Sequence, residues 1–200
     1  MVIPVPSAET SELPRDGWTA LTAEAKSERL LSAAADVFAS HGLEAPMSEV
    51  AEAAGAGVAS VYRRFPSKRE LLAALVIRRM EQIVEAAWVA EASAGDRWSA
   101  LTSMLHSIVE RQSADDFLGE ARAAVDDVPG VTEATDRATA ALERLLVAAR
   151  AEGRLRSDAT TLDLRLLFAA TRAAKRVERE EWPRMLELLI DALDSRPHTD

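Results

Sequence analysis

The spacing of apolar residues most constrains what this 200-residue chain can fold into, because it follows a helical period almost from end to end. Alanine is abundant, runs of β-branched residues are scarce, and no segment sustains the alternation of a strand. No internal repeat is present. The sequence therefore predicts an all-α protein of about nine helices. The expected helices span residues 23–41, 46–54, 58–64, 68–92, 96–113, 115–128, 132–152, 161–176 and 181–194.

Composition excludes several classes of protein. The chain has no cysteine, which rules out a disulfide scaffold, a thiol nucleophile and zinc–thiolate sites. The first 21 residues lack the basic start of a signal peptide and contain three prolines. No apolar run approaches the ~20 residues that span a bilayer. We expect a soluble, cytoplasmic protein with a disordered leader over 1–21 and no membrane contact.

Charge is distributed unevenly along the chain, whose net charge is -9. Residues 56–80 hold 6 basic and 1 acidic side chains, whereas residues 1–55 hold 3 and 9, and residues 81–200 hold 15 and 23. A positive segment in a negative chain indicates a local contact with a polyanion. The alternative is a solvated helix face with a chance cluster of charge.

The first three expected helices are joined by short turns, with "AGAG" between the second and the third. This is the form of a helix-turn-helix unit, whose second helix enters the major groove of DNA. Here that helix is "VASVYRR", which is small at its N-terminal end and basic at its C-terminal end. Its position strengthens the functional interpretation of the positive segment.

The stretch "VFASHGLEAPMSEVAEAAGAGVASVYRRFPSKRELL" resembles the N-terminal domain of the TetR family of bacterial transcriptional repressors. The resemblance lies in Phe38, Gly42, Val50-Ala51, Ala54-Gly55, Tyr62, Phe65 and Ser67-Lys68. Gly57 departs from the pattern, since the family often has Ser or Thr at that position. The resemblance implies a DNA-binding domain over 22–67 and a ligand-binding and dimerisation domain over 68–200.

The resemblance also implies site residues. Tyr62 and Lys68 would bind phosphates, and either arginine of "YRR" could reach a phosphate or a guanine edge. The alternative for Tyr62 is a half-buried helix residue. The partner would be a double-stranded operator with an inverted repeat. The expected DNA-binding residues are Val58, Ala59, Ser60, Tyr62, Arg63, Arg64 and Lys68.

The last two expected helices are apolar on more than one face, and the second face must be buried somewhere. The resemblance implies that they pair with the same helices of a second subunit. The alternative is that the last helix is central in its own domain. The expected interface residues are Leu162, Leu166, Ala169, Ala173, Met185, Leu186, Leu189 and Leu193.

A small, largely apolar molecule is expected to bind among the helices over 68–176 and to lower DNA affinity. The resemblance implies the mechanism, in which the ligand moves the helix over 68–92 and this helix carries the DNA-binding domains apart. Aromatic and methionine side chains could line an apolar cavity, with a histidine or an arginine fixing the orientation of the ligand. The alternative for each is ordinary core. The residues of this set are Trp88, Trp98, Met104, His106, Phe117, Phe168 and Arg172.

No pattern of catalytic, cofactor-binding or metal-binding residues appears. His106 and Glu110 share a helix face, but a single His–Glu pair is not a metal site. "GAGVAS" follows a helix rather than a strand and lacks the lysine of a phosphate-binding loop. The leading hypothesis is therefore a homodimeric, ligand-responsive repressor without enzymatic activity, cofactor or metal. Two alternatives are a helical ligand-binding or adaptor protein that does not bind DNA, and an all-α enzyme.

Overall fold

A computed structural model gives the architecture of the chain and describes residues 16–93, 95–111, 117–177 and 181–195. The described part is helical and contains no β-ladder beyond one isolated bridge between Leu155 and Asp194. None of its helices is long and apolar enough to cross a lipid bilayer. The helices are α1 (Asp16–Thr19), α2 (Ala23–His41), α3 (Met47–Ala53), α4 (Val58–Arg64), α5 (Lys68–Ala92), α6 (Arg97–Arg111), α7 (Leu118–Ala124), α8 (Pro129–Ala151), α9 (Thr161–Val177) and α10 (Trp182–Asp191).

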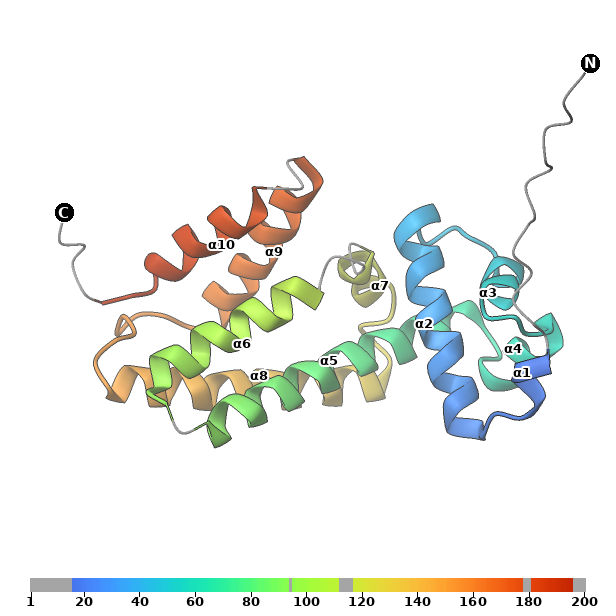
Figure 1. Cartoon of the computed structure of the whole chain (residues 1–200), viewed down its shortest axis with the longest axis horizontal. Coiled ribbons are helices and arrows are strands. Elements are labelled where there is room, and N and C mark those ends of the chain that lie inside the picture. Colours follow the sequence, from blue (N-terminus) through green and yellow to red (C-terminus); the bar gives the residue numbers. More distant parts are fainter. Residues whose placement is uncertain (1–15, 94, 112–116, 178–180, 196–200) are drawn as a thin grey trace, which may run out of the picture.

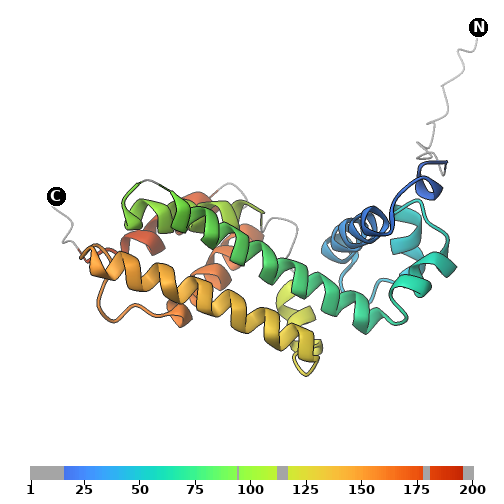
Figure 2. The ribbon, with the colours of Figure 1, turned by 90° about the horizontal axis from the view of Figure 1, so that it is seen from below.

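Helix α5 connects two groups of helices (Figure 1). One end lies beside α2, α3 and α4, and the rest runs into the larger bundle of α6, α8, α9 and α10. Turning the molecule shows α5 and α8 side by side along their lengths (Figure 2). The predicted all-α class and the two-part organisation are confirmed.

The short helices of the N-terminal group are delimited by local sequence signals. The Thr22 hydroxyl accepts a hydrogen bond from the Ala25 amide at 3.2 Å, which caps the start of α2. Gly42 and Gly55 follow α2 and α3 with φ of 76° and 64°, a conformation that costs glycine little. Ser67 caps α5 by accepting from the Glu70 amide at 3.2 Å. The predicted bounds of α2, α4 and α5 agree with the structure, and these signals explain both ends of α2 and the start of α5.

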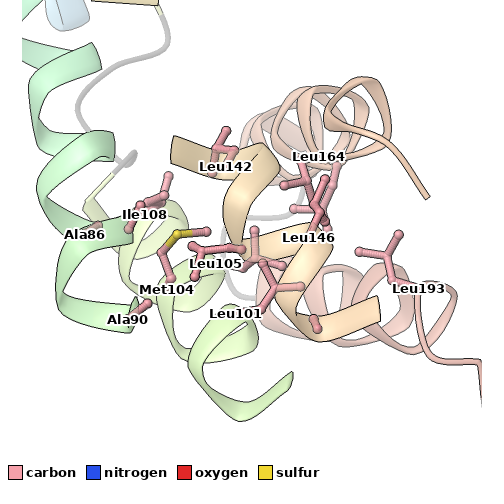
Figure 3. Close-up of a cluster of buried hydrophobic side chains, with 14 of the residues drawn as sticks. Ala86, Ala90, Leu101, Met104, Leu105, Ile108, Leu142, Leu146, Leu164 and Leu193 are labelled. Carbon is pink, nitrogen blue, oxygen red and sulfur yellow. The ribbon is translucent and has the colours of Figure 1, made fainter. Parts of the chain in front are cut away.

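The larger bundle is held together by a cluster of leucine, isoleucine, methionine and alanine side chains (Figure 3). They come from α5, α6, α8, α9 and α10, and from the turn after α10. Leu101, Leu105 and Leu146 lie at its centre and are fully buried. The cluster orders these five helices around a common apolar interior.

Helix α7 belongs to the other apolar cluster, which fills the N-terminal group. Phe117, Ala121 and Val125 are buried there, together with the first turns of α5. The rings of Phe117 and Phe38 lie 5.7 Å apart between centroids and are inclined by 59°. The apolar core around the helix-turn-helix therefore extends past residue 67 and includes a helix from the C-terminal half.

Three sequence expectations differ from the structure. Helix α8 begins at Pro129 rather than at the expected residue 132, because proline at the first helical position sacrifices no hydrogen bond. Helix α7 occupies only the middle of the predicted span 115–128. A turn of helix forms over Asp16–Thr19, within the segment expected to be a disordered leader; residues 1–15 of that segment lie outside the described part of the chain.

The contact between α7 and the N-terminal group should be stabilising. We expect Phe117→Ala to lower the free energy of unfolding by about 3–5 kcal/mol, because a fully buried ring leaves a cavity. Val89→Ala is the control, because the Val89 side chain is 68% exposed, and it should change the free energy of unfolding by less than about 0.5 kcal/mol. Chemical denaturation measures both, and equal effects would contradict this packing.

Candidate DNA-binding surface and ligand cavity

Helix α4 presents one buried edge and one exposed edge. Val61 is fully buried, and Phe65 after the helix is also in the core, so these two residues anchor it. Val58, Ala59 and Tyr62 are exposed on the other side, and Tyr62 is 46% accessible. This exposed fraction fits a phosphate contact and equally fits the alternative of a half-buried helix residue. The exposed edge is thus free to meet a partner over two turns of helix.

The basic residues of α4 are fixed in different ways. Arg63 is exposed, and its guanidinium donates to the Ser60 hydroxyl at 3.0 Å. The Arg64 Nε donates to the Ser27 hydroxyl of α2 at 2.6 Å, and its guanidinium lies 5.9 Å from the centroid of the Phe65 ring. Arg64 is therefore held against α2, whereas Arg63 is tied only to its own helix and is the freer of the two.

Lys68 stands at the start of α5, beside the exposed edge of α4. Its ammonium lies 5.7 Å from the centroid of the Phe38 ring, so an aromatic face restrains the charge. Arg64 and Lys68 are thereby held at different points along α2, Arg64 at Ser27 and Lys68 at Phe38. Separated cations of this kind suit contact with phosphates that flank a groove.

A cavity of about 380 Å³ lies in the C-terminal half and is lined by residues of α5, α6, α7, α8 and α9. Its volume falls in the usual range of small-molecule sites, ~300–1,000 Å³. Apolar lining comes from side chains such as Ile83, Ile108, Leu142 and Phe168. Four arginines also line it, namely Arg79, Arg122, Arg165 and Arg172.

The structure does not bring the predicted pocket residues together. Phe168 and Arg172 line the cavity, but Trp98 is buried in the bundle core and Phe117 in the N-terminal cluster. Trp88 is 66% exposed on α5, so its assignment to a pocket is wrong. Helical spacing shows that a face is apolar, but it does not show which gap between helices stays open.

The two remaining members of that set also lie elsewhere. Met104 is in the bundle core and borders a separate groove of about 400 Å³ between α5 and α6. His106 is half-buried, and its Nε2 lies 3.2 Å from a carboxylate oxygen of Glu187 on α10. Neither lines the cavity that holds Phe168. Of the arginines in this cavity the sequence indicated only Arg172, because helical spacing does not show which charged side chains face a gap between helices.

Helix α9 carries the predicted interface face outward. Leu162 and Leu166 are 56% and 58% exposed, and Ala169 and Ala173 continue the same stripe. Leu164 and Leu167 on the opposite side are in the core. Two apolar faces are therefore present on one helix. The core covers one of them, and the other is exposed, with Leu162, Leu166 and Ala169 also lining the α5–α9 cavity.

On α10 the predicted stripe is only partly exposed, since Met185 faces outward and the other predicted residues do not. Leu186 and Leu193 are buried in their own chain, and Leu189 is partly buried against the same core. The outward apolar residues are Met185 and Leu188, of which Leu188 is 51% exposed. The predicted assignment of Leu186 and Leu193 to an interface is therefore corrected in favour of the face that Leu188 presents.

Metal chemistry has no built site within the described ranges. No group of three or more histidine, aspartate or glutamate side chains there could hold a metal ion. The groups that dominate the two candidate sites are cationic and apolar. Such groups bind anions and the apolar parts of molecules.

Two family models match the chain. Residues 30–75 match "Bacterial regulatory proteins, tetR family", and residues 98–195 match "Transcriptional regulator SbtR-like, C-terminal domain". No curated protein matches the chain.

Solved structures of TetR regulators are similar over most of their length. A TetR regulator from Mycobacterium vanbaalenii is 30% identical with a TM-score of 0.59, covering 84% of this chain and 93% of that one. A TetR regulator from Streptomyces coelicolor is 25% identical with a TM-score of 0.65, covering 86% and 99%. AmtR from Mycobacterium smegmatis, at 21% identity, a TM-score of 0.63 and 89% of each chain, is similar in fold.

These matches cover both the helix-turn-helix and the larger helical bundle. They favour a regulator of transcription over an adaptor that does not bind DNA, and the family consists of regulators rather than enzymes. The chain belongs to the TetR family of bacterial regulatory proteins and is a DNA-binding transcriptional regulator.

Proposed function

We propose that this chain is a cytoplasmic, homodimeric repressor that leaves an inverted-repeat operator when a small molecule with a large apolar part occupies the α5–α9 cavity. One observation carries the proposal: α5 and α7 each contribute to the cavity wall and to the core of the helix-turn-helix unit. A change in the cavity is therefore felt at the DNA-binding surface.

At α7 the two roles fall to neighbouring residues. Leu118, Gly119 and Arg122 line the cavity, Ala121 and Val125 are buried in the N-terminal cluster, and Leu118 also packs against that cluster. A ligand that displaces the cavity wall therefore displaces the packing of the cluster, because packed cores resist continuous deformation.

A polar contact adds to this link. Arg69, next to Lys68, donates to the carbonyl oxygen of Ala124 at 2.9 Å and pairs with Asp127. The start of α5 is thereby tied to the end of α7. The DNA-proximal lysine and the cavity wall are thus connected through a few directly bonded residues.

Dimerisation follows from the uncovered face of α9 and α10. Leu162, Leu166, Met185 and Leu188 place exposed apolar side chains on two helices that pack on each other. The same patch on a second copy would bury it with two-fold symmetry. Two helix-turn-helix units would then meet two half-sites about one DNA turn apart, or a multiple of one turn.

DNA binding should depend on the surface formed by α4 and the start of α5. Lys68→Ala should weaken binding to all DNA sequences and lower the slope of log affinity against log salt concentration by about 1. Arg63→Ala should reduce the free-energy difference between the operator and a mismatched sequence by about 1–3 kcal/mol, if Arg63 reads a guanine. Arg156→Ala is the control, since Arg156 is exposed in the α8–α9 loop and pairs with Asp158. Affinity for a selected operator at several salt concentrations measures these effects. Unaltered affinity in a Tyr62→Phe, Lys68→Ala double variant would contradict the assignment.

The dimer face can be tested with an exposed residue, so that folding is spared. Leu188→Glu should convert the dimer into a folded monomer, because two carboxylates would be buried across the two-fold interface. Val147→Glu, at a side chain 52% exposed on α8, is the matched control and should stay dimeric. Sedimentation measures the mass, and circular dichroism confirms the helix content. A wild-type monomer at micromolar concentration would refute the dimer.

Ligand and operator must affect each other reciprocally. An inducer that weakens DNA binding must itself bind more weakly to the DNA complex, typically by about 1–3 kcal/mol. Fluorescence titration of the inducer with and without operator measures this difference. Equal affinity in the two titrations would show that the molecule is not an inducer.

A further inference from the structure

The charge of the α5–α9 cavity indicates what kind of molecule it binds. We propose that its ligand is an amphipathic organic anion, with an apolar body and a carboxylate or phosphate group held by arginines. The inference rests on the proposed function, because it takes this cavity as the regulatory site. It adds the charge and the chemical class of the ligand.

Arginines reach the cavity from three helices. Arg79 comes from α5, Arg122 from α7, and Arg165 and Arg172 from α9. The seven-residue separation of the last two places them on the same face of α9, two turns apart. Such convergence on one space is not expected of solvated surface charges, which point away from one another.

Arg172 crosses from α9 to the start of α7. Its two terminal nitrogens lie 3.5 Å from the position that a Cβ atom would take on Gly119. Because position 119 has no side chain, the guanidinium can lie against the α7 backbone. Arg122 follows Gly119 by three residues and so lies one helical turn along the same side. Two guanidinium groups are thereby brought to one end of the cavity.

Opposite charge is missing from the cavity wall. Among the described lining residues none is acidic, and no described carboxylate is paired with Arg122, Arg165 or Arg172. Elsewhere on this chain, arginines such as Arg144 and Arg154 pair with Glu91 and Asp194. In a chain with a net charge of -9, this leaves a local excess of positive charge around an apolar space.

The chemistry of the lining selects an anion with an apolar body. Guanidinium groups match carboxylate and phosphate oxygens with paired hydrogen bonds, and they repel an amine. The cavity also has apolar surface, which inorganic phosphate would not cover. This surface comes from Ile83, Ile108, Leu142 and Phe168. Carboxylates and phosphate monoesters share this chemistry, and the test below separates them.

Of the two pockets in the C-terminal bundle, the groove between α5 and α6 has no arginine in its described lining. The groove is of similar volume, about 400 Å³, but it is lined by four serines, and its one charged residue is Glu85. The anion is therefore assigned to the α5–α9 cavity and not to the groove.

Two fluorescent probes that differ only in a negatively charged group test whether the cavity prefers an anion. Anilinonaphthalene sulfonate is an organic anion with an apolar body, and phenylnaphthylamine is the same body without the sulfonate. We expect the full-length protein to bind the sulfonate at least about tenfold more tightly than the uncharged compound, since hydrogen bonds to charged groups are the stronger kind. Displacement by decanoate and by decyl phosphate, with decan-1-ol as the uncharged competitor, then shows which acid group the site prefers.

Variants show whether the arginines are responsible. Arg172→Gln and Arg122→Gln should each lower the affinity for the sulfonate about tenfold and leave phenylnaphthylamine unchanged. Thr139→Glu, at another lining position, should do the same by supplying an internal carboxylate. Arg137→Gln is the control, because Arg137 lies on α8 outside the cavity and faces Glu81. Thermal melts of all four variants confirm that they fold.

The outcomes separate this proposal from the proposed function. Equal affinity for the charged and uncharged probes, no displacement by either acid, or sulfonate binding that survives in all three cavity variants would overturn the anion assignment. None of these results bears on DNA release. Conversely, an anion that binds as expected but leaves operator affinity unchanged would uphold the anion site and contradict ligand-controlled repression.

Discussion

The packing of α7 against the helix-turn-helix core is the contact on which the rest of this structure depends. Phe117 and Phe38 form a tilted aromatic pair, a geometry that adds to the burial of their area. The pair comes from parts of the chain 79 residues apart in sequence. It lies inside the N-terminal apolar cluster and fixes α7 to the DNA-binding unit, which is therefore not attached through α5 alone. Because α7 also lines the cavity, it connects the proposed ligand site with the DNA-binding unit.

Positive charge is concentrated at the two places where binding is proposed. The chain carries -9 overall, yet basic side chains gather around α4 and around the α5–α9 cavity. Both sites place cations next to apolar or small side chains, and both would meet anions. The acidic remainder of the surface opposes non-specific association with nucleic acid, so the DNA contact is confined to one face.

The sequence specified most of the fold because its local signals are strong. The bounds of α2, α4 and α5 follow from a threonine cap, glycine stops and a serine cap, which act within a few residues. The exposed edge of α4 could be predicted for the same reason. The cavity could not, since it depends on how five helices leave a gap, and no local pattern distinguishes Trp88 on the outside from Phe168 on the wall. The outward stripe of α10 was misassigned because both of its faces are apolar.

Native-state hydrogen exchange of the backbone amides tests most directly whether α7 and the helix-turn-helix unit form one cooperative folding unit. If they do, amides of α7 and α2 exchange with the same opening free energy and respond alike to denaturant, as members of one cooperative unit. A seven-residue helix lying loosely on the surface would exchange much faster than α2. That result, with α2 still protected, would contradict the account, because no rigid path would then lead from the cavity to the DNA surface.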